Sequence, residues 1–121
     1  MAQPNIVNVT SIFGQTSCST LTTDITKVFL SCSADDVIKV NSIIASNING
    51  DDPAKITVFY YCKALDKVSK LANEVIIPAH TTLVIMGKDS PIYLQENDEL
   101  RAGSDQGNAV DVTVSYEVLR D

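Results

Sequence analysis

The residues that could carry out chemistry in this 121-residue chain are few and far apart in the sequence. Its single histidine, His80, follows Pro78-Ala79 in an expected turn, and catalysis by an imidazole needs a nucleophile or an orienting group beside it. None of the patterns GxSxG, GxGxxG and GxxxxGK[ST] occurs. We therefore expect a protein without enzymatic activity and without catalytic residues.

Carboxylates occur in short runs that could act as the acid pair of a glycosidase or bind calcium through oxygen atoms. These runs are Asp35-Asp36, Asp51-Asp52 and Glu96 to Glu99. All of them fall in expected turns, where Asp and Asn are favoured for backbone reasons. The loop at 49–52 also lacks the alternating ligands and distal Glu of an EF-hand. We interpret them as solvated turns and expect no metal and no cofactor.

The cysteines Cys18, Cys32 and Cys62 are odd in number, whereas the disulfide framework of a small secreted protein needs an even set. With no CxxC and one histidine, zinc ligands are lacking. Buried apolar thiols are the main interpretation, and a Cys18–Cys32 bridge is the alternative. We expect no signal peptide and no membrane span, so synthesis in a reducing cytoplasm is predicted.

The charge balance argues against nucleic acid as a partner. Nine Lys and Arg stand against fifteen Asp and Glu, which gives a formal net charge of −6. An acidic domain repels phosphate backbones. The nearest approach to a basic cluster is Lys63, Lys67 and Lys70, which is typical of a solvated loop or sheet edge.

The elements that must position these residues are β-strands. From Val110 to Val118 every even-numbered residue is apolar or aromatic and every odd-numbered one is polar, which predicts a strand with one face in the core and one in water. The other strand candidates are separated by turn signals about every ten residues, and no helix long enough for a parallel crossover is visible. They are 27–32, 37–48, 54–65, 75–77, 81–86, 92–94 and 100–102, and 63–73 is expected to be a polar connection, weakly helical at best.

This pattern predicts an all-β fold, an antiparallel β-sandwich of jelly-roll or Ig-like type with about eight short strands. We expect one domain over residues 16–121. Residues 1–15 are expected to form an N-terminal arm or a first strand. As an arm, this segment would pair with the sheet edge of a neighbouring subunit.

Two groups of apolar residues are candidates for contact surfaces. The first lies in the arm and consists of Ile6, Val7, Val9, Ile12 and Phe13. The second consists of Phe59 and Tyr61, because the strand at 54–65 carries apolar residues on both faces and one face could meet a partner.

Several stretches make the chain resemble small virion structural proteins of tailed bacteriophages, especially contractile-tailed phages of marine cyanobacteria. Similar sequences have an IIxSNxxG hairpin, a PAxxTL turn and a final AVxVxVSYE strand. This chain has Asn97 where many of them carry Gly before an Asp, and both residues tolerate positive φ. The matching stretches here are 5–12, 40–48, 75–84, 92–98 and 112–119.

The resemblance implies a virion component that is repeated around a symmetric particle, and it supplies no catalytic residues. We accordingly expect a capsid decoration protein that bridges subunits, is a homo-oligomer and contacts the major capsid protein. A neck, tail or fibre-attachment component is the alternative within this class. A host-glycan-binding module acting through loops 50–53 and 103–107 is the alternative outside it.

Overall fold

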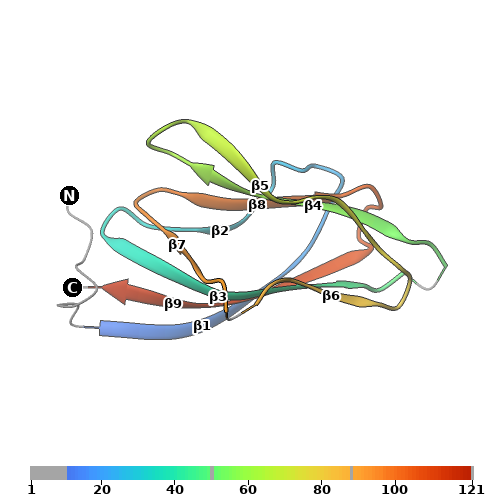
Figure 1. The fold of residues 1–121 in the computed structure, drawn as a ribbon, viewed down its shortest axis with the longest axis horizontal. Helices are drawn as coiled ribbons and strands as arrows, with labels where there is room; N and C mark the ends of the chain where they lie inside the picture. Colours follow the sequence, from blue (N-terminus) through green and yellow to red (C-terminus); the bar gives the residue numbers. More distant parts are fainter. Residues whose placement is uncertain (1–10, 50, 88, 121) are drawn as a thin grey trace.

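The computed structural model describes residues 11–49, 51–87 and 89–120, and this part of the chain folds into two antiparallel sheets packed face to face (Figure 1). The predicted β-sandwich is therefore confirmed. The described residues form nine strands: β1 (Ser11–Thr20), β2 (Val28–Ser31), β3 (Asp36–Asn47), β4 (Ala54–Cys62), β5 (Lys67–Ile77), β6 (Thr82–Met86), β7 (Ile92–Leu94), β8 (Glu99–Ser104) and β9 (Val110–Arg120).

The strand order identifies the sandwich as a jelly roll. One sheet has the order β1-β9-β3-β6, with β7 also pairing β3, and the other has the order β2-β8-β4-β5. β1 thus pairs β9, β2 pairs β8, β3 pairs β6 and β7, and β4 pairs β5. This nested pairing is the rolled double Greek key rather than the Ig-like arrangement, in which the first strand pairs the second.

The alternating segments supply the core, as their period predicts. On β9 the side chains of Val110, Val112 and Val114 are 0–1% exposed. Val114 and Val112 lie beside Ile43 and Ala45, their partners on β3, both 0% exposed. The opposite sheet contributes an equivalent set of buried aliphatic side chains, among them Ile56, Val58, Leu100 and Ala102.

One predicted element is wrong. Residues 63–73 were expected to form a polar connection, but β5 occupies Lys67–Ile77 and pairs β4 along its length. Nearly all of β5 is exposed, and at 67–71 both faces of the strand are in solvent. A strand exposed on both faces has no period-two alternation, so the sequence pattern could not reveal it. Figure 1 shows the tip of the β4–β5 hairpin standing clear of the other strands.

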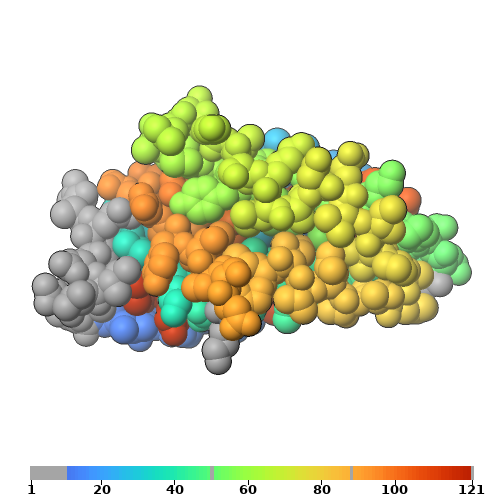
Figure 2. Space-filling view, in the orientation of Figure 1, coloured from blue at the N-terminus to red at the C-terminus, as the bar shows by residue number. Residues whose placement is uncertain are grey.

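On one long side of the sandwich, β5 and β6 bring the two sheets together. They are consecutive strands of different sheets, joined by the turn at 78–81, and they contact each other. Figure 2 shows their residues, in yellow, forming one continuous surface. Since β5 and β6 lie at the ends of their sheets on this side, β1 and β2 are the edge strands at the opposite ends.

Candidate functional site

The predicted contact residues of the arm are only partly described. Ile6, Val7 and Val9 lie outside the described residues. Ile12 is 60% exposed and Phe13 is 43% exposed, and both belong to β1. The expected boundary after Gln15 therefore falls inside a strand that is paired with β9 from end to end.

Ile12 and Phe13 point to opposite faces of the sheet. Phe13 lies opposite Val118, which packs in the core, so its ring is on the inner side. The Arg120 guanidinium lies over this ring, 5.4 Å from its centroid. Ile12 lies opposite Leu119 on the outer side of the sheet.

The second candidate pair does not form an exposed apolar face. Phe59 is only 5% exposed within the single chain, flanked by its cross-strand partners Lys70 and Arg101. Tyr61 is partly exposed, but its hydroxyl donates to Asp66 Oδ1 at 2.7 Å. Phe59 is thus covered by its own subunit, and a charged residue there would disturb its local packing before it reported on a partner.

The edge of β1 is the least protected sheet edge of the described structure. Its ten residues pair with β9 in one unbroken register, without a bulge. The segment Ser11–Thr20 contains no charged residue and no proline. Leu21 N donates to Val110 O at 2.8 Å, and because the direction of hydrogen bonding alternates along a strand, the N–H of Thr16 points away from β9 toward the free edge.

The edge strands β5 and β2 carry features that oppose pairing with another chain. The register of β5 shifts twice against β4, Glu74 has a φ of 51°, and Lys67 and Lys70 project from the strand. β2 is four residues long and its pairing with β8 is irregular. Bulges, short length and lysines are the means by which natural sheets avoid edge-to-edge aggregation. β1 has none of them.

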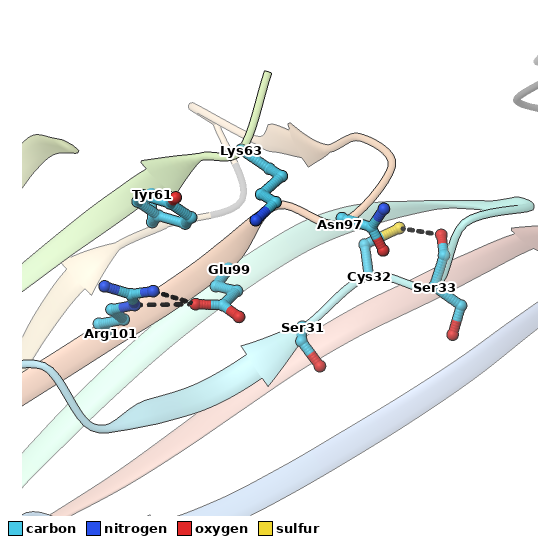
Figure 3. A pocket seen from close by; sticks show the side chains of 8 residues that line it. All are labelled: Ser31, Cys32, Ser33, Tyr61, Lys63, Asn97, Glu99 and Arg101. Atoms are coloured by element: carbon cyan, nitrogen blue, oxygen red, sulfur yellow. Dashed lines mark hydrogen bonds and ion pairs between the residues drawn. The ribbon is translucent and has the colours of Figure 1, made fainter. Parts of the chain in front are cut away.

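A separate feature is a surface hollow of about 480 Å³ at the end of the β2-β8-β4-β5 sheet (Figure 3). It is lined by residues that end β2, follow β4 and begin β8: Ser31, Cys32, Ser33, Tyr61, Lys63, Asn97, Glu99 and Arg101. Arg101 Nε donates to Glu99 Oε1 at 2.8 Å, and Arg101 Nη2 forms an ion pair with the same oxygen at 2.6 Å. Its guanidinium lies over the Tyr61 ring, 4.2 Å from the centroid.

The backbone around this hollow is held by a buried carboxylate. Asp98 is 3% exposed and accepts hydrogen bonds from the Tyr60 hydroxyl, from Lys63 N at 2.9 Å and from Gln95 N at 3.2 Å. Burial and this carboxylate raise the pKa of Tyr60, so its hydroxyl stays protonated and donates. Asn97 takes the left-handed conformation, with φ 61°, and its N–H donates to Cys32 O.

The thiol in this hollow is not poised as a nucleophile. Cys32 is 3% exposed and its Sγ lies 3.1 Å from the carbonyl oxygen of Asp36. Burial, followed by the nearby Asp36 carboxylate, raises the pKa of the thiol to about 11. The Cys32 thiolate required for nucleophilic attack is therefore scarce at neutral pH.

The other residues considered for chemistry are scattered. His80 is exposed in the turn after β5 and has a φ of 58°. All three cysteines are free, so the alternative Cys18–Cys32 bridge is absent. Within residues 11–49, 51–87 and 89–120, no cluster of three or more His, Cys, Asp or Glu could hold a metal ion. Over the same ranges, no helix has the length and apolar character needed to cross a membrane.

The two loops considered for glycan recognition lie at the other end of the sandwich. Ile48 N donates to Ala109 O at 2.8 Å, and Lys55 N donates to Asp105 Oδ1 at 2.8 Å, so residues flanking the first loop contact the second. The hollow lies instead beside the β4–β5 and β7–β8 turns. Sequence reasoning missed it because its residues come from three separate segments and carry no shared motif.

Comparison with known proteins gives the fold and no family. No protein-family model and no curated protein matches the sequence. The chain is similar to a protein of the Bacillus endospore appendages, a family of disulfide-linked pili, with a TM-score of 0.51 and 10% identity over 92% of this chain and 90% of that chain. It is also similar to a chain of infectious bursal disease virus, Gx strain, with a TM-score of 0.47 and 10% identity. That match covers 91% of this chain and 33% of the viral one. At such identity the likeness to the pilus protein concerns the fold alone.

Proposed function

We propose that this protein is a non-enzymatic structural subunit of a virion that assembles through the free edge of β1. Within that class, the resemblance of the sequence to tailed-phage proteins favours a head decoration protein over a neck, tail or fibre-attachment part. A subunit of this kind acts by burying surface between neighbours rather than by chemistry.

The observation that carries the proposal is the contrast between β1 and the other edges. A strand of ten residues with unpaired N–H and C=O groups is a template for another strand. Natural proteins block such edges, as β5 and β2 are blocked here. An edge left uncharged and straight from Ser11 to Thr20 is expected where pairing with another chain is the purpose.

The pattern of exposure on β1 supports the same proposal. No side chain of β1 is fully buried, although the strand is firmly paired to β9. Ile12 and Phe13 remain 60% and 43% exposed at its first residues. An added strand would extend the sheet and cover these apolar groups, which is a favourable contribution. The jelly-roll fold shared with a pilus protein is a precedent for subunits of this shape forming assemblies.

The proposal is tested by blocking the edge without opening the β1–β9 pair. Thr16→Pro removes an N–H that points away from β9, and Thr16→Lys adds a charge at the middle of the edge. We expect the wild-type chain to self-associate and to bind emptied phage heads. Each variant should weaken both by about tenfold, the scale of one or two net hydrogen bonds. Sedimentation velocity over a concentration series and co-pelleting with heads measure the two effects.

Ser69→Lys on the exposed, already protected edge strand β5 is the matched control and should associate like the wild type. Wild-type association by both Thr16 variants would contradict the β1 edge as the contact. A deletion variant lacking residues 1–10 tests the arm separately. It leaves β1 whole, whereas a deletion through Gln15 would remove half of the strand.

A further inference from the structure

We propose that the hollow lined by Lys63, Glu99 and Asn97 is a binding site for a neutral saccharide. This inference does not rest on assembly through β1, because the hollow lies on the other sheet and is formed by a single chain. The site differs in place and in residues from the loops that the sequence suggested for glycan recognition.

Hydrogen-bond donors and acceptors that have no partner within the described residues lie together in this hollow. Within the described part of the chain, the Lys63 ammonium, the Asn97 amide and the hydroxyls of Ser31 and Ser33 have no hydrogen-bond or ion-pair partner. Glu99 uses only Oε1 for Arg101, so its Oε2 is available as an acceptor. Figure 3 shows the Lys63 side chain extending into the hollow between Glu99 and Asn97.

Such a mixture of donors and acceptors matches a ring that carries several hydroxyl groups. Each sugar hydroxyl donates one hydrogen bond and accepts others, as a Ser or Thr hydroxyl does. A carboxylate oxygen would accept from one hydroxyl, while the ammonium and the amide would donate to its neighbours. The Tyr61 ring supplies the main apolar surface of the hollow and is already stacked with Arg101, so a purely apolar ligand finds little to contact.

The charge around the hollow disfavours an anion. Lys63 and Arg101 are offset by Glu99 and by Asp66, which accepts the Tyr61 hydroxyl. The carboxylates of Asp36, Asp98 and Glu96 also lie close enough to raise the pKa of the Cys32 thiol, after the larger effect of burial. The protein as a whole has a net charge of −6. A phosphate or sulfate would meet this repulsion, whereas a neutral polyol would not.

The size and rigidity of the hollow fit a small ligand. Its volume of about 480 Å³ is in the usual range for small-molecule sites. The segments that line it are tied together by Asp98, through Lys63 N and Gln95 N, and by the bond from Asn97 N to Cys32 O. A site fixed before binding loses little entropy when the ligand arrives. Because the hollow is open to solvent, we expect a dissociation constant on the order of 1 mM.

The test is an NMR titration of the ¹⁵N-labelled full chain with D-glucose, D-galactose, D-mannose and N-acetyl-D-glucosamine in turn. We expect at least one sugar to cause saturable shifts confined to the amides of 31–33, 61–63 and 97–101. Lys63→Met and Glu99→Gln should each weaken that binding about tenfold while leaving the rest of the spectrum in place. Lys70→Met, on the same sheet but outside the hollow, is the matched control and should bind like the wild type.

Three results would overturn the proposal. The first is the absence of saturable shifts with all four sugars. The second is a set of shifts at 48–53 and 104–109 in place of the hollow. The third is a stronger response at the hollow to sodium sulfate than to any sugar, which would mark an anion site. None of these results bears on association through β1, so failure of this site and failure of the proposed function can be told apart.

Discussion

Buried polar residues hold the ends of strands in place in this fold, and Asp98 is one that makes three side-chain hydrogen bonds. Its two oxygens accept from the Tyr60 hydroxyl and from two backbone N–H groups, and it is 3% exposed. A buried group with all its bonds satisfied stabilises the fold, whereas a partly satisfied one is costly.

Replacing Asp98 should therefore destabilise the protein. Asn in this position has one acceptor oxygen and an amide that faces N–H donors, so we expect Asp98→Asn to lower the free energy of unfolding by about 2–3 kcal/mol. Tyr60→Phe removes one of the three bonds and should cost about 1 kcal/mol. Urea unfolding followed by circular dichroism measures both, and an Asp98→Asn variant as stable as the wild type would contradict this role.

A second carboxylate gives the protein a predictable response to acid. Asp36 is 5% exposed and accepts from Arg120 Nε at 2.9 Å and Nη2 at 2.8 Å. The Arg120 hydrogen bonds hold the pKa of Asp36 below its ordinary value. The stabilisation of the fold by the Asp36–Arg120 pair is therefore complete above about pH 3.9, the pKa of an Asp in the unfolded chain. It is lost as the pH falls through the lower pKa of Asp36 in the folded protein.

We accordingly expect Asp36→Asn to lower the melting temperature at pH 7, and this difference from the wild type to shrink steadily below about pH 4. Thermal unfolding recorded between pH 7 and pH 2.5 measures it. Asp35→Asn, an exposed neighbour without an ion pair among the described residues, should show no difference at any pH. A gap that stays constant down to the lowest pH would show that Asp36 acts by packing alone.

Among the elements, the crossing between β1 and β2 depends on a glycine. The segment at 22–27 runs along β8, with Ser104 N donating to Thr22 O and Ala102 N donating to Lys27 O. A Cβ on Gly103 would lie 2.5 Å from Ile25 Cα and 2.8 Å from Ile25 N. These are backbone atoms, so the crossing segment itself would have to move.

Gly103→Ala is thus expected to destabilise the protein by about 1–3 kcal/mol, the usual cost of overpacking. Gly14 provides the matched control, since a Cβ there meets nothing within 4 Å and φ is not positive. Gly14→Ala should be neutral or slightly stabilising, because alanine restricts the unfolded chain. Chemical denaturation of the two variants side by side measures the contrast, and equal stabilities would refute the close approach.

At the scale of the whole molecule, the nested pairing sets the folding rate. β1 pairs β9 from Ser11 opposite Arg120 to Thr20 opposite Asp111, so the two ends of the described chain are paired although they are far apart in the sequence. Folds dominated by such distant pairs refold in roughly milliseconds to seconds, because loop closure must precede the contacts.

A circular permutant tests this account. Joining Arg120 to Ser11 by Asn-Gly, with new termini in the loop at 51–53, turns the β1–β9 pair into a hairpin. We expect faster refolding with nearly unchanged equilibrium stability, measured by stopped-flow tyrosine fluorescence, since the chain has four Tyr and no Trp. An Asn-Gly insertion at 51–53 without permutation is the control and should refold at the wild-type rate. An unchanged rate in the permutant would show that closing β1 onto β9 is not limiting.

The sequence by itself determined the all-β class and most of the strands, because half-buried strands alternate with period two and turns select Asn, Asp, Gly and Pro. It predicted the end of β5, at 75–77, but could not reveal the part before it, because both faces are exposed at 67–71 and impose no pattern. Nor could it show that Phe59 is covered by its own subunit, because alternation predicts to which face of the sheet a side chain points but not which residues pack against that face.

Only the tertiary structure decided between a jelly roll and an Ig-like sandwich, because strand order is a property of long-range pairing that local patterns do not encode. The same holds for the two candidate sites. The edge of β1 is significant only beside the protected edges of β2 and β5, and the hollow exists because β2, β4 and β8 bring residues from 31 to 101 to one end of a sheet. Alternation is a property of neighbouring residues and can be read from the sequence, whereas sheet edges and hollows depend on the pairing of strands that are distant in the sequence.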